Sequence, residues 1–222
     1  MTKSILALAA ACLLAAPGTA MAQSLGFGAR VGTLGAGAEA AIGLSSHLVV
    51  RGGLGLLPLE RSATMSGIPF TLTLPKTWYN VGVDLYIAGP VRIGAGMLFK
   101  PDDPVVDATI DPGRQVGIGD TTYTAQAVFK LHGIFDSQNQ APYVLLGFGK
   151  HTASGIGLFL DLGVAFLGDP SVSLSASGDP TILNDPRFQT ELRKEETNVQ
   201  NDAGTYLKLW PVLSLGVRVG TG

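Results

Sequence analysis

The residues of this chain best suited to chemistry are six charged side chains that share one setting. Each stands among glycines or other small residues, on one side of a segment whose alternate positions are apolar. The six residues are Glu39, Arg51, Asp84, Arg92, Asp161 and Arg218. Opposite charges facing each other across neighbouring strands form stabilising pairs, and charges lining a pore select ions. We therefore expect these side chains to act electrostatically, as internal ion pairs or as the lining of a lumen.

Two of the expected pairings follow from the turns between neighbouring segments. Residues 43–46 and 88–90 have the length and composition of tight hairpin connections. A turn centred on residue 45 places Glu39 opposite Arg51. A turn centred on residue 88 places Asp84 opposite Arg92. Both hairpins would then carry an acid–base pair on the side that bears glycine.

Other residue types that commonly support catalysis or metal binding form no recognisable pattern. His47, His132 and His151 are scattered, and their spacing places no serine beside a histidine and an acid. The aspartates between residues 102 and 120 match no calcium-binding loop. The Gly-x-Gly pairs lie inside alternating segments and lack the helix of a phosphate-binding fingerprint. We expect no catalytic residue, no metal and no cofactor.

The segments that must position the charges are predicted to be β-strands. The clearest is 156–167, where Leu158, Leu160 and Leu162 share one side and Asp161 lies on the other. A period of two is typical of a strand, because successive side chains point to opposite sides. The segments that alternate clearly are 34–43, 47–57, 81–88, 91–100, 143–149, 156–167 and 207–219.

At least one further strand is expected, because bacterial barrels usually contain an even number. The phase of alternation breaks between Val31 and Leu34, so residues 25–33 are either a separate first strand or part of a bulged one. Weaker candidates lie at 70–74, 123–135 and 172–176. The predicted fold is all-β, an antiparallel transmembrane β-barrel of about eight strands, with ten as the alternative.

The composition favours a barrel in a membrane. Charged residues make up 14% of the chain, compared with about 25% in a typical soluble domain. Glycine accounts for 30 of 222 residues, about twice its usual share. After the first residues, no apolar run reaches the roughly 18 residues of a membrane helix, so any span would have to be a closed barrel. The net charge of −2 argues against a nucleic-acid partner.

The first 22 residues have the features of a secretory signal peptide. Lys3 precedes an apolar run over residues 5–16, and Ala20-Met21-Ala22 is a small-x-small cleavage site. We divide the chain into a signal peptide, 1–22, and a single barrel domain, 23–222. The only cysteine, Cys12, belongs to this leader, so the remaining chain has no disulfide to stabilise it.

Three long, mostly polar segments, 60–69, 102–123 and 168–205, are expected to be loops on one rim of the barrel. The last contains a predicted short helix over 185–201, with Asp185 as its N-cap and Pro186 at the first helical position. Aromatic residues near the strand ends are expected to form an interfacial girdle. They are Trp78, Tyr79, Phe99, Tyr143, Phe166, Tyr206 and Trp210.

Three segments carry a resemblance to a known kind of protein. They are Ala-Pro-Tyr-Val-Leu-Leu-Gly-Phe-Gly at 141–149, Phe-Leu-Asp-Leu-Gly-Val-Ala-Phe at 159–166 and Trp-Pro-Val-Leu-Ser-Leu-Gly at 210–216. With the leader, they resemble a family of small, uncharacterised Gram-negative outer-membrane β-barrel proteins, similar in size to the OmpA membrane domain. The resemblance covers most of the chain after the leader. It implies a monomer in the cell outer membrane, with lipid, lipopolysaccharide and the barrel-assembly machinery as partners.

The sequence thus predicts an integral outer-membrane barrel that is not an enzyme. Its role would be structural, or that of a small-solute or ion channel with a charged, glycine-lined lumen. Two alternatives remain open at this point. One is a soluble periplasmic β-barrel that binds an apolar ligand, and the other is a barrel enzyme that acts on lipids.

Overall fold

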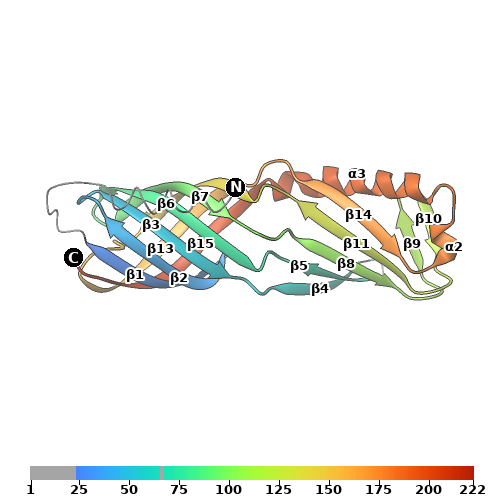
Figure 1. Cartoon of the computed structure of the whole chain (residues 1–222), viewed down its shortest axis with the longest axis horizontal. Coiled ribbons are helices and arrows are strands. Elements are labelled where there is room, and N and C mark those ends of the chain that lie inside the picture. Colours follow the sequence, from blue (N-terminus) through green and yellow to red (C-terminus); the bar gives the residue numbers. More distant parts are fainter. Residues whose placement is uncertain (1–23, 66–67) are drawn as a thin grey trace, which may run out of the picture.

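The computed structural model describes residues 24–65 and 68–222, so the predicted leader at 1–22 lies outside the described residues. The molecule is elongated, with a barrel at one end and a sheet-and-helix extension at the other (Figure 1). Eight antiparallel strands close the barrel in the order β1-β15-β13-β12-β7-β6-β3-β2. Their bounds are β1 Leu25–Gly32, β2 Gly35–Gly43, β3 Leu48–Leu56, β6 Thr77–Ala88, β7 Val91–Phe99, β12 Gln140–Phe148, β13 Gly155–Phe166 and β15 Leu209–Gly220.

The predicted number of eight barrel strands is confirmed, and the segment around 25–33 is a separate first strand. The weaker candidates are also strands, but they lie in a second sheet outside the barrel. This five-stranded sheet has the order β14-β11-β8-β5-β4. Its strands are β4 Glu60–Met65, β5 Ile68–Thr73, β8 Val105–Ile110, β11 Phe129–Asp136 and β14 Ser171–Ser177, and a hairpin is formed by β9 Gln115–Ile118 and β10 Thr121–Thr124.

The long segments do connect barrel strands at one rim, as predicted, but they are folded into strands and helices and are not irregular loops. They form the extension, because short apolar patterns on separate connections pair with one another and share one core. That core contains Ile110, Ile118 and Phe129 from the strands, and Phe188 and Leu192 from a helix. No single connection could bury enough apolar surface to fold in this way by itself.

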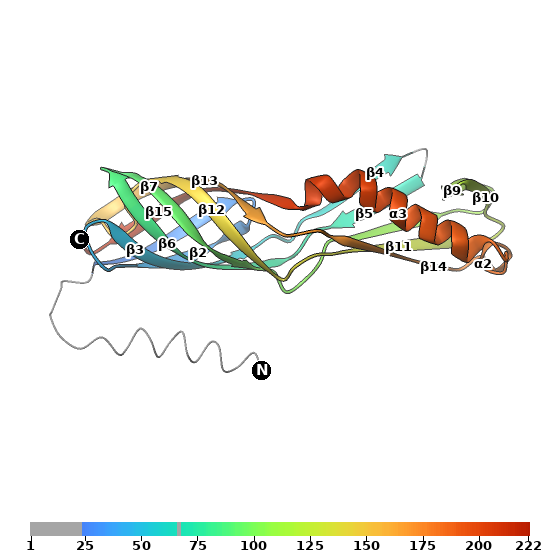
Figure 2. The same ribbon diagram turned by 90° about the horizontal axis from the view of Figure 1, so that it is seen from above.

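Two helices belong to the extension: α2 (Pro180–Leu183) and α3 (Phe188–Leu207). In Figure 2, α3 lies along the sheet beside β14. The helix predicted at 185–201 exists, but its regular part begins at Phe188, after a turn in which Asp185 Oδ1 accepts the backbone N–H of Arg187 at 2.8 Å. Neither helix in the described part of the chain is both long and apolar enough to cross a membrane.

Glutamates of α3 attach the helix to the rest of the extension. Glu191 Oε2 accepts the backbone N–H of Asp120 at 2.7 Å, and Glu195 Oε2 accepts that of Gly119 at 3.0 Å, both from the β9–β10 turn. Glu196 Oε1 accepts the backbone N–H of Leu174 in the edge strand β14 at 2.7 Å. These side chains satisfy backbone donors that no neighbouring strand reaches.

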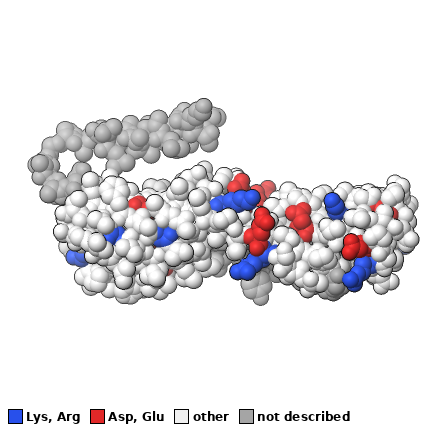
Figure 3. Space-filling model, turned by 90° about the horizontal axis from the view of Figure 1, so that it is seen from below, with Lys and Arg blue, Asp and Glu red and all other residues white. Residues whose placement is uncertain are grey.

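The barrel wall alternates between a buried and an exposed side along most of its strands, as in β12 and β15. The exposed side is apolar all round; Ile156 and Leu158 are 79% and 68% exposed, and Phe27, Val81, Ile93 and Leu215 are also exposed. Figure 3 shows few charged atoms on this face of the barrel, whereas acids and bases gather where the barrel meets the extension and beyond it. The barrel is apolar outside and polar inside, the reverse of a soluble protein.

The two predicted hairpin registers were each wrong by two residues. Glu39 is opposite Gly53 rather than Arg51, and Asp84 is opposite Gly94 rather than Arg92. Each turn is centred one residue later than expected, and a register irregularity lies between Tyr86 and its neighbours in β6. A shift of two leaves every side chain on its predicted side of the sheet.

Candidate functional site: a buried ionic network in the barrel

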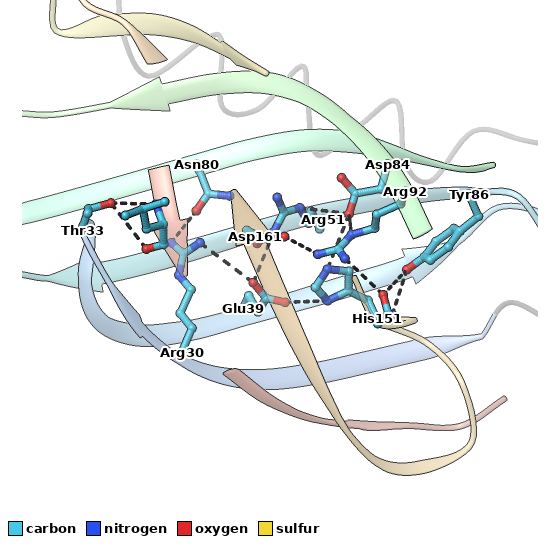
Figure 4. A network of polar contacts seen from close by, with 12 residues as sticks. Arg30, Thr33, Glu39, Arg51, Asn80, Asp84, Tyr86, Arg92, His151 and Asp161 are labelled. Carbon is cyan, nitrogen blue, oxygen red and sulfur yellow. Dashed lines mark hydrogen bonds and ion pairs between the residues drawn. The ribbon is translucent and has the colours of Figure 1, made fainter. Parts of the chain in front are cut away.

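The barrel interior holds a cluster of charged side chains supplied by six different strands (Figure 4). In strand order they are Arg30 of β1, Glu39 of β2, Arg51 of β3, Asp84 of β6, Arg92 of β7 and Asp161 of β13. All are buried, and Arg92 has 0% exposure. Glycines on the inner side make the room: a Cβ at Gly147 would overlap the Arg92 guanidinium. The same alternation therefore puts both the charged side chains and the glycines that make room for them inside the barrel.

Arg51 is the centre of the network. Its Nη1 lies 2.9 Å from Asp161 Oδ2 and 3.5 Å from Glu39 Oε2, and its Nε lies 3.2 Å from Asp84 Oδ2. Arg92 bridges two of the same acids, with Nε 2.8 Å from Asp84 Oδ2 and Nη2 paired with Asp161. Two guanidinium groups thus connect three carboxylates, which offsets the large cost of burying each charge alone.

A small space with a mixed lining, which includes Leu34, Leu98 and Leu145, lies on the extension side of this cluster. Arg30 Nη2 donates to Asn80 Oδ1 at 2.6 Å, while its Nη1 is 3.9 Å from Glu39. Arg30, Asn80 and Tyr143 line a cavity of about 10 Å³, near the lower limit for holding one water molecule. Side chains therefore fill the lumen at this level.

An apolar layer closes the lumen toward the extension. Trp78 is buried and stacks on Trp210 with ring centroids 4.9 Å apart, and its Nε1 donates to Pro75 O at 3.1 Å. Leu98 and Leu145 belong to the same cluster. The interior of the barrel thus contains an ionic network in its middle and a layer of apolar side chains at this end.

This arrangement corrects the predicted aromatic girdle. Trp78 and Tyr143 are buried inside the barrel, so they cannot contact a membrane interface. Their inward phase could have been seen by extending the alternation of the neighbouring charged positions. The other members are placed as follows: Tyr79 and Phe166 are exposed, Phe99 and Trp210 are half-buried, and the side chain of Tyr206 lies outside the described residues.

The opposite mouth of the barrel is filled by a side chain that the sequence reasoning did not select. His151, in the turn between β12 and β13, is buried with its Nδ1 2.7 Å from Glu39 Oε1 and its Nε2 3.5 Å from Asp84 Oδ2. Its ring packs on Phe159 with centroids 4.8 Å apart. Arg218, expected among the lumen charges, lies on the buried, inner side of β15 and donates to the backbone oxygens of Ala153 and Gly155 near this mouth.

Two other members of the network were also missed. Arg30 lies on the same side of β1 as the inward glycines, so its alternation contained a usable signal. Asn80 likewise shares its side of β6 with Asp84. His151 had no such signal, because it belongs to a turn, where no periodicity tells which way a side chain points.

The remaining histidines lie on the surface. His132 Nδ1 is 2.7 Å from Asp107 Oδ1 on the sheet of the extension. Ser175 is opposite His132, but its hydroxyl donates to the backbone oxygen of that residue and not to the ring. His47 Nδ1 is hydrogen-bonded to the neighbouring Ser46 hydroxyl at 2.8 Å. Within residues 24–65 and 68–222, no group of three or more histidine, cysteine or acidic residues could hold a metal ion.

Fold and site together define a closed eight-stranded antiparallel barrel with an apolar exterior, a buried ionic interior and a folded extension at one rim. No protein-family model matches the chain, and no curated protein sequence matches it. Solved structures are similar to it in fold. The crystal structure of CarO2 from Acinetobacter baumannii has a TM-score of 0.59 and 20% identity, covering 88% of this chain and 97% of that one.

A second similar structure is CarO from the same organism, with a TM-score of 0.52, 20% identity and coverage of 87% and 96%. In both cases the matched part of this chain is much larger than the barrel strands alone. The similarity in fold therefore extends from the barrel into the extension.

Proposed function

We propose that this protein is an integral outer-membrane β-barrel with a closed lumen, which anchors a folded sheet-and-helix extension outside the cell. The single observation that carries this proposal is the reversed polarity of the barrel. Large apolar side chains cover its outside while Arg51, Asp84, Arg92 and Asp161 are buried within it. In water such an exterior would be a large aggregation-prone patch, whereas hydrocarbon is its natural solvent.

The two rims support an orientation. The β2–β3, β6–β7 and β12–β13 turns and the strand ends at residues 25 and 220 gather at one rim. The extension rises from the other rim, which also carries the tight β1–β2 turn (Figures 1 and 2). Barrels of the outer membrane keep short turns in the periplasm and long connections outside. Exposed Tyr79 and Phe166 would then belong to the girdle on the external side, next to charged residues such as Lys208 and Asp169, which are paired at 2.5 Å.

The closed lumen favours an anchoring role over that of an open channel. The Arg51 and Arg92 bridges fill the middle, and the Trp78 layer closes the lumen beyond them. We infer that the protein works as a monomer among lipid and lipopolysaccharide, after insertion by the barrel-assembly machinery. Neither alternative is favoured by a specific observation: charges occupy the place of an apolar ligand, and no serine hydroxyl completes a triad at His132.

Membrane fractionation and detergent folding test the proposal. The expressed protein should sediment with the outer membrane, require detergent for extraction, and migrate differently on gels before and after heating. In planar bilayers it should insert with few or no steady conductance steps. Recovery as a stable, detergent-free soluble protein would overturn the membrane assignment, and steady conductance would overturn the closed lumen.

A further inference from the structure

The turn between β12 and β13 folds back into the short-turn mouth of the barrel. We call residues 149–155 the latch. Gly149 and Gly155 at its ends have φ of 97° and 75°, a conformation that glycine adopts without strain, so the chain reverses sharply at both. This path carries His151 inward until its side chain is 1% exposed (Figure 4). The latch therefore covers the network from the side opposite Trp78.

Several contacts to the backbone hold the latch irrespective of histidine protonation, including Gly149 N–H to Pro90 O at 2.9 Å and Gly222 N–H to Thr152 O at 3.0 Å. The backbone N–H of His151 donates to the Tyr86 hydroxyl at 2.9 Å. Arg92 Nη1 donates to Gly149 O at 3.1 Å, and Arg218 Nη1 donates to Gly155 O at 2.9 Å. Arginine stays charged at all physiological pH values, so these contacts do not titrate there.

The contacts of the imidazole ring do depend on protonation. Nδ1 faces Glu39 Oε1 at 2.7 Å and Nε2 faces Asp84 Oδ2 at 3.5 Å. An ionised carboxylate can only accept hydrogen bonds, and a neutral imidazole has one N–H donor and one lone pair. A neutral His151 would therefore direct a lone pair at one of the two acids. Only the protonated ring presents an N–H to both acids.

Glu39 is the acid of the network that the arginines contact least closely. Glu39, Asp84 and Asp161 are contacted within 3.5 Å by only two guanidinium groups, those of Arg51 and Arg92. The next cation, Arg30 of β1, is 3.9 Å from Glu39 and donates to Asn80. On its remaining side the ring meets Phe159 of β13, which is uncharged. With Arg30 counted, three arginines match the three acids, so a protonated His151 adds a further positive charge, placed directly against Glu39.

We propose that the latch is a pH-dependent closure of the barrel mouth, held shut while His151 is protonated and loosened when the ring releases its proton to water. This rests on the proposed function, in which the closed barrel sits in a membrane. Histidine is the side chain that ordinarily changes charge between pH 5 and 8. Protonation of the ring would keep the mouth shut, and loss of that proton at higher pH would open the network to water from this end.

Hydrogen exchange of the folded protein in detergent micelles tests the latch directly. Exchange of residues 149–155 is measured at about pH 5.5 and pH 8.5, corrected for the intrinsic pH dependence of amide exchange. Protection of the amides of residues 149–155 should fall about tenfold at the higher pH. The reason is that one buried carboxylate would then lose its hydrogen-bond donor. The strand β15 should keep its protection. The His151→Gln variant, whose side chain does not titrate, should show the same protection at both pH values.

Two further variants complete the test. His47→Gln alters an exposed histidine in the β2–β3 turn and should keep the pH response of the unaltered protein. If His151→Gln fails to fold, Glu39→Gln serves instead, because its amide can donate to a neutral ring and should abolish the response. The latch would be overturned if protection of residues 149–155 in the unaltered folded barrel were the same at both pH values, or if the pH response survived in His151→Gln or in Glu39→Gln. Failure to fold in detergent would instead count against the proposed function.

Discussion

Arg51 and Asp161 form an ion pair across the full width of the barrel. Their strands, β3 and β13, are four positions apart in the closed order in either direction, yet Arg51 Nη1 and Asp161 Oδ2 are 2.9 Å apart. Two residues on opposite walls can meet only where the lumen is filled by their own side chains. An eight-stranded barrel is narrow enough for this.

Replacing Arg51 should destabilise the barrel strongly. Arg51→Met leaves Glu39, Asp84 and Asp161 with one fewer cation in a buried site, and breaking such a pair costs about 3–5 kcal/mol. The measurement is the urea midpoint of the heat-modifiable folded form in detergent. Arg61→Met, on the exposed edge strand β4, is the control and should leave the midpoint unchanged. Equal midpoints for both variants would contradict a structural role for the network.

Exchanging the charges of Glu39 and Arg51 should not restore stability. If the two residues formed an isolated pair, the double variant Glu39→Arg with Arg51→Glu would recover what each single reversal loses. Here a glutamate at position 51 would also face Asp84 and Asp161. We expect the double variant to be about as unstable as Arg51→Glu alone, by several kcal/mol. Substantial recovery in a double-mutant cycle would show that the pair acts independently.

Truncating Trp78 should both weaken and open the barrel. Trp78→Ala removes a fully buried ring from the apolar layer and should cost about 3–5 kcal/mol. Its neighbour Tyr79 points outward, so Tyr79→Ala is a matched control that should lose much less stability in detergent. Bilayer recordings should show more frequent transient openings for the Trp78 variant than for the Tyr79 variant. The reverse ranking would contradict the assignment of these two faces.

Acid should loosen the extension before the barrel. The hydrogen bond from Lys194, with the Asp120 N–H, holds the pKa of Glu191 below its usual value, and the Ala127 N–H does the same for the pKa of Asp179. A carboxyl group whose pKa is lower in the folded than in the unfolded protein stabilises the fold at pH values above its unfolded-state pKa. This stabilisation is lost as the pH falls through the folded-state pKa. The added stability is therefore present at neutral pH and declines below about pH 4.

Limited proteolysis with pepsin across that range measures the effect. Cleavage within residues 180–207 should increase as the pH is lowered, while the barrel strands stay intact. Glu191→Gln should shift this susceptibility to higher pH, and Glu60→Gln, at an exposed position of β4, should not. Cleavage that is independent of pH would argue that these carboxylates do not hold α3 in place.

Several features of this protein follow from the sequence alone. The strict alternation around Asp161 and Asp84 determines strands, their apolar exterior and their inward charges, because a period of two is a local property of extended backbone. The same rule would have placed Arg30, Trp78 and Tyr143 inside. The seven clear segments and the one at 25–33 supply the eight barrel strands, but only the pairing in the structure leaves the other candidate segments out of the barrel.

Only the tertiary structure decided which charges meet and what covers them. The partner of Arg51 across the lumen depends on how the closed sheet is staggered and how far a guanidinium reaches, which no single strand encodes. His151 points inward because of where the chain reverses direction, at Gly149 and Gly155, relative to the barrel mouth. The extension depends on pairing between connections far apart in the chain, such as β5 with β8. Local periodicity sets the sides of a strand, whereas contacts across a lumen or between distant segments exist only once the sheet has closed.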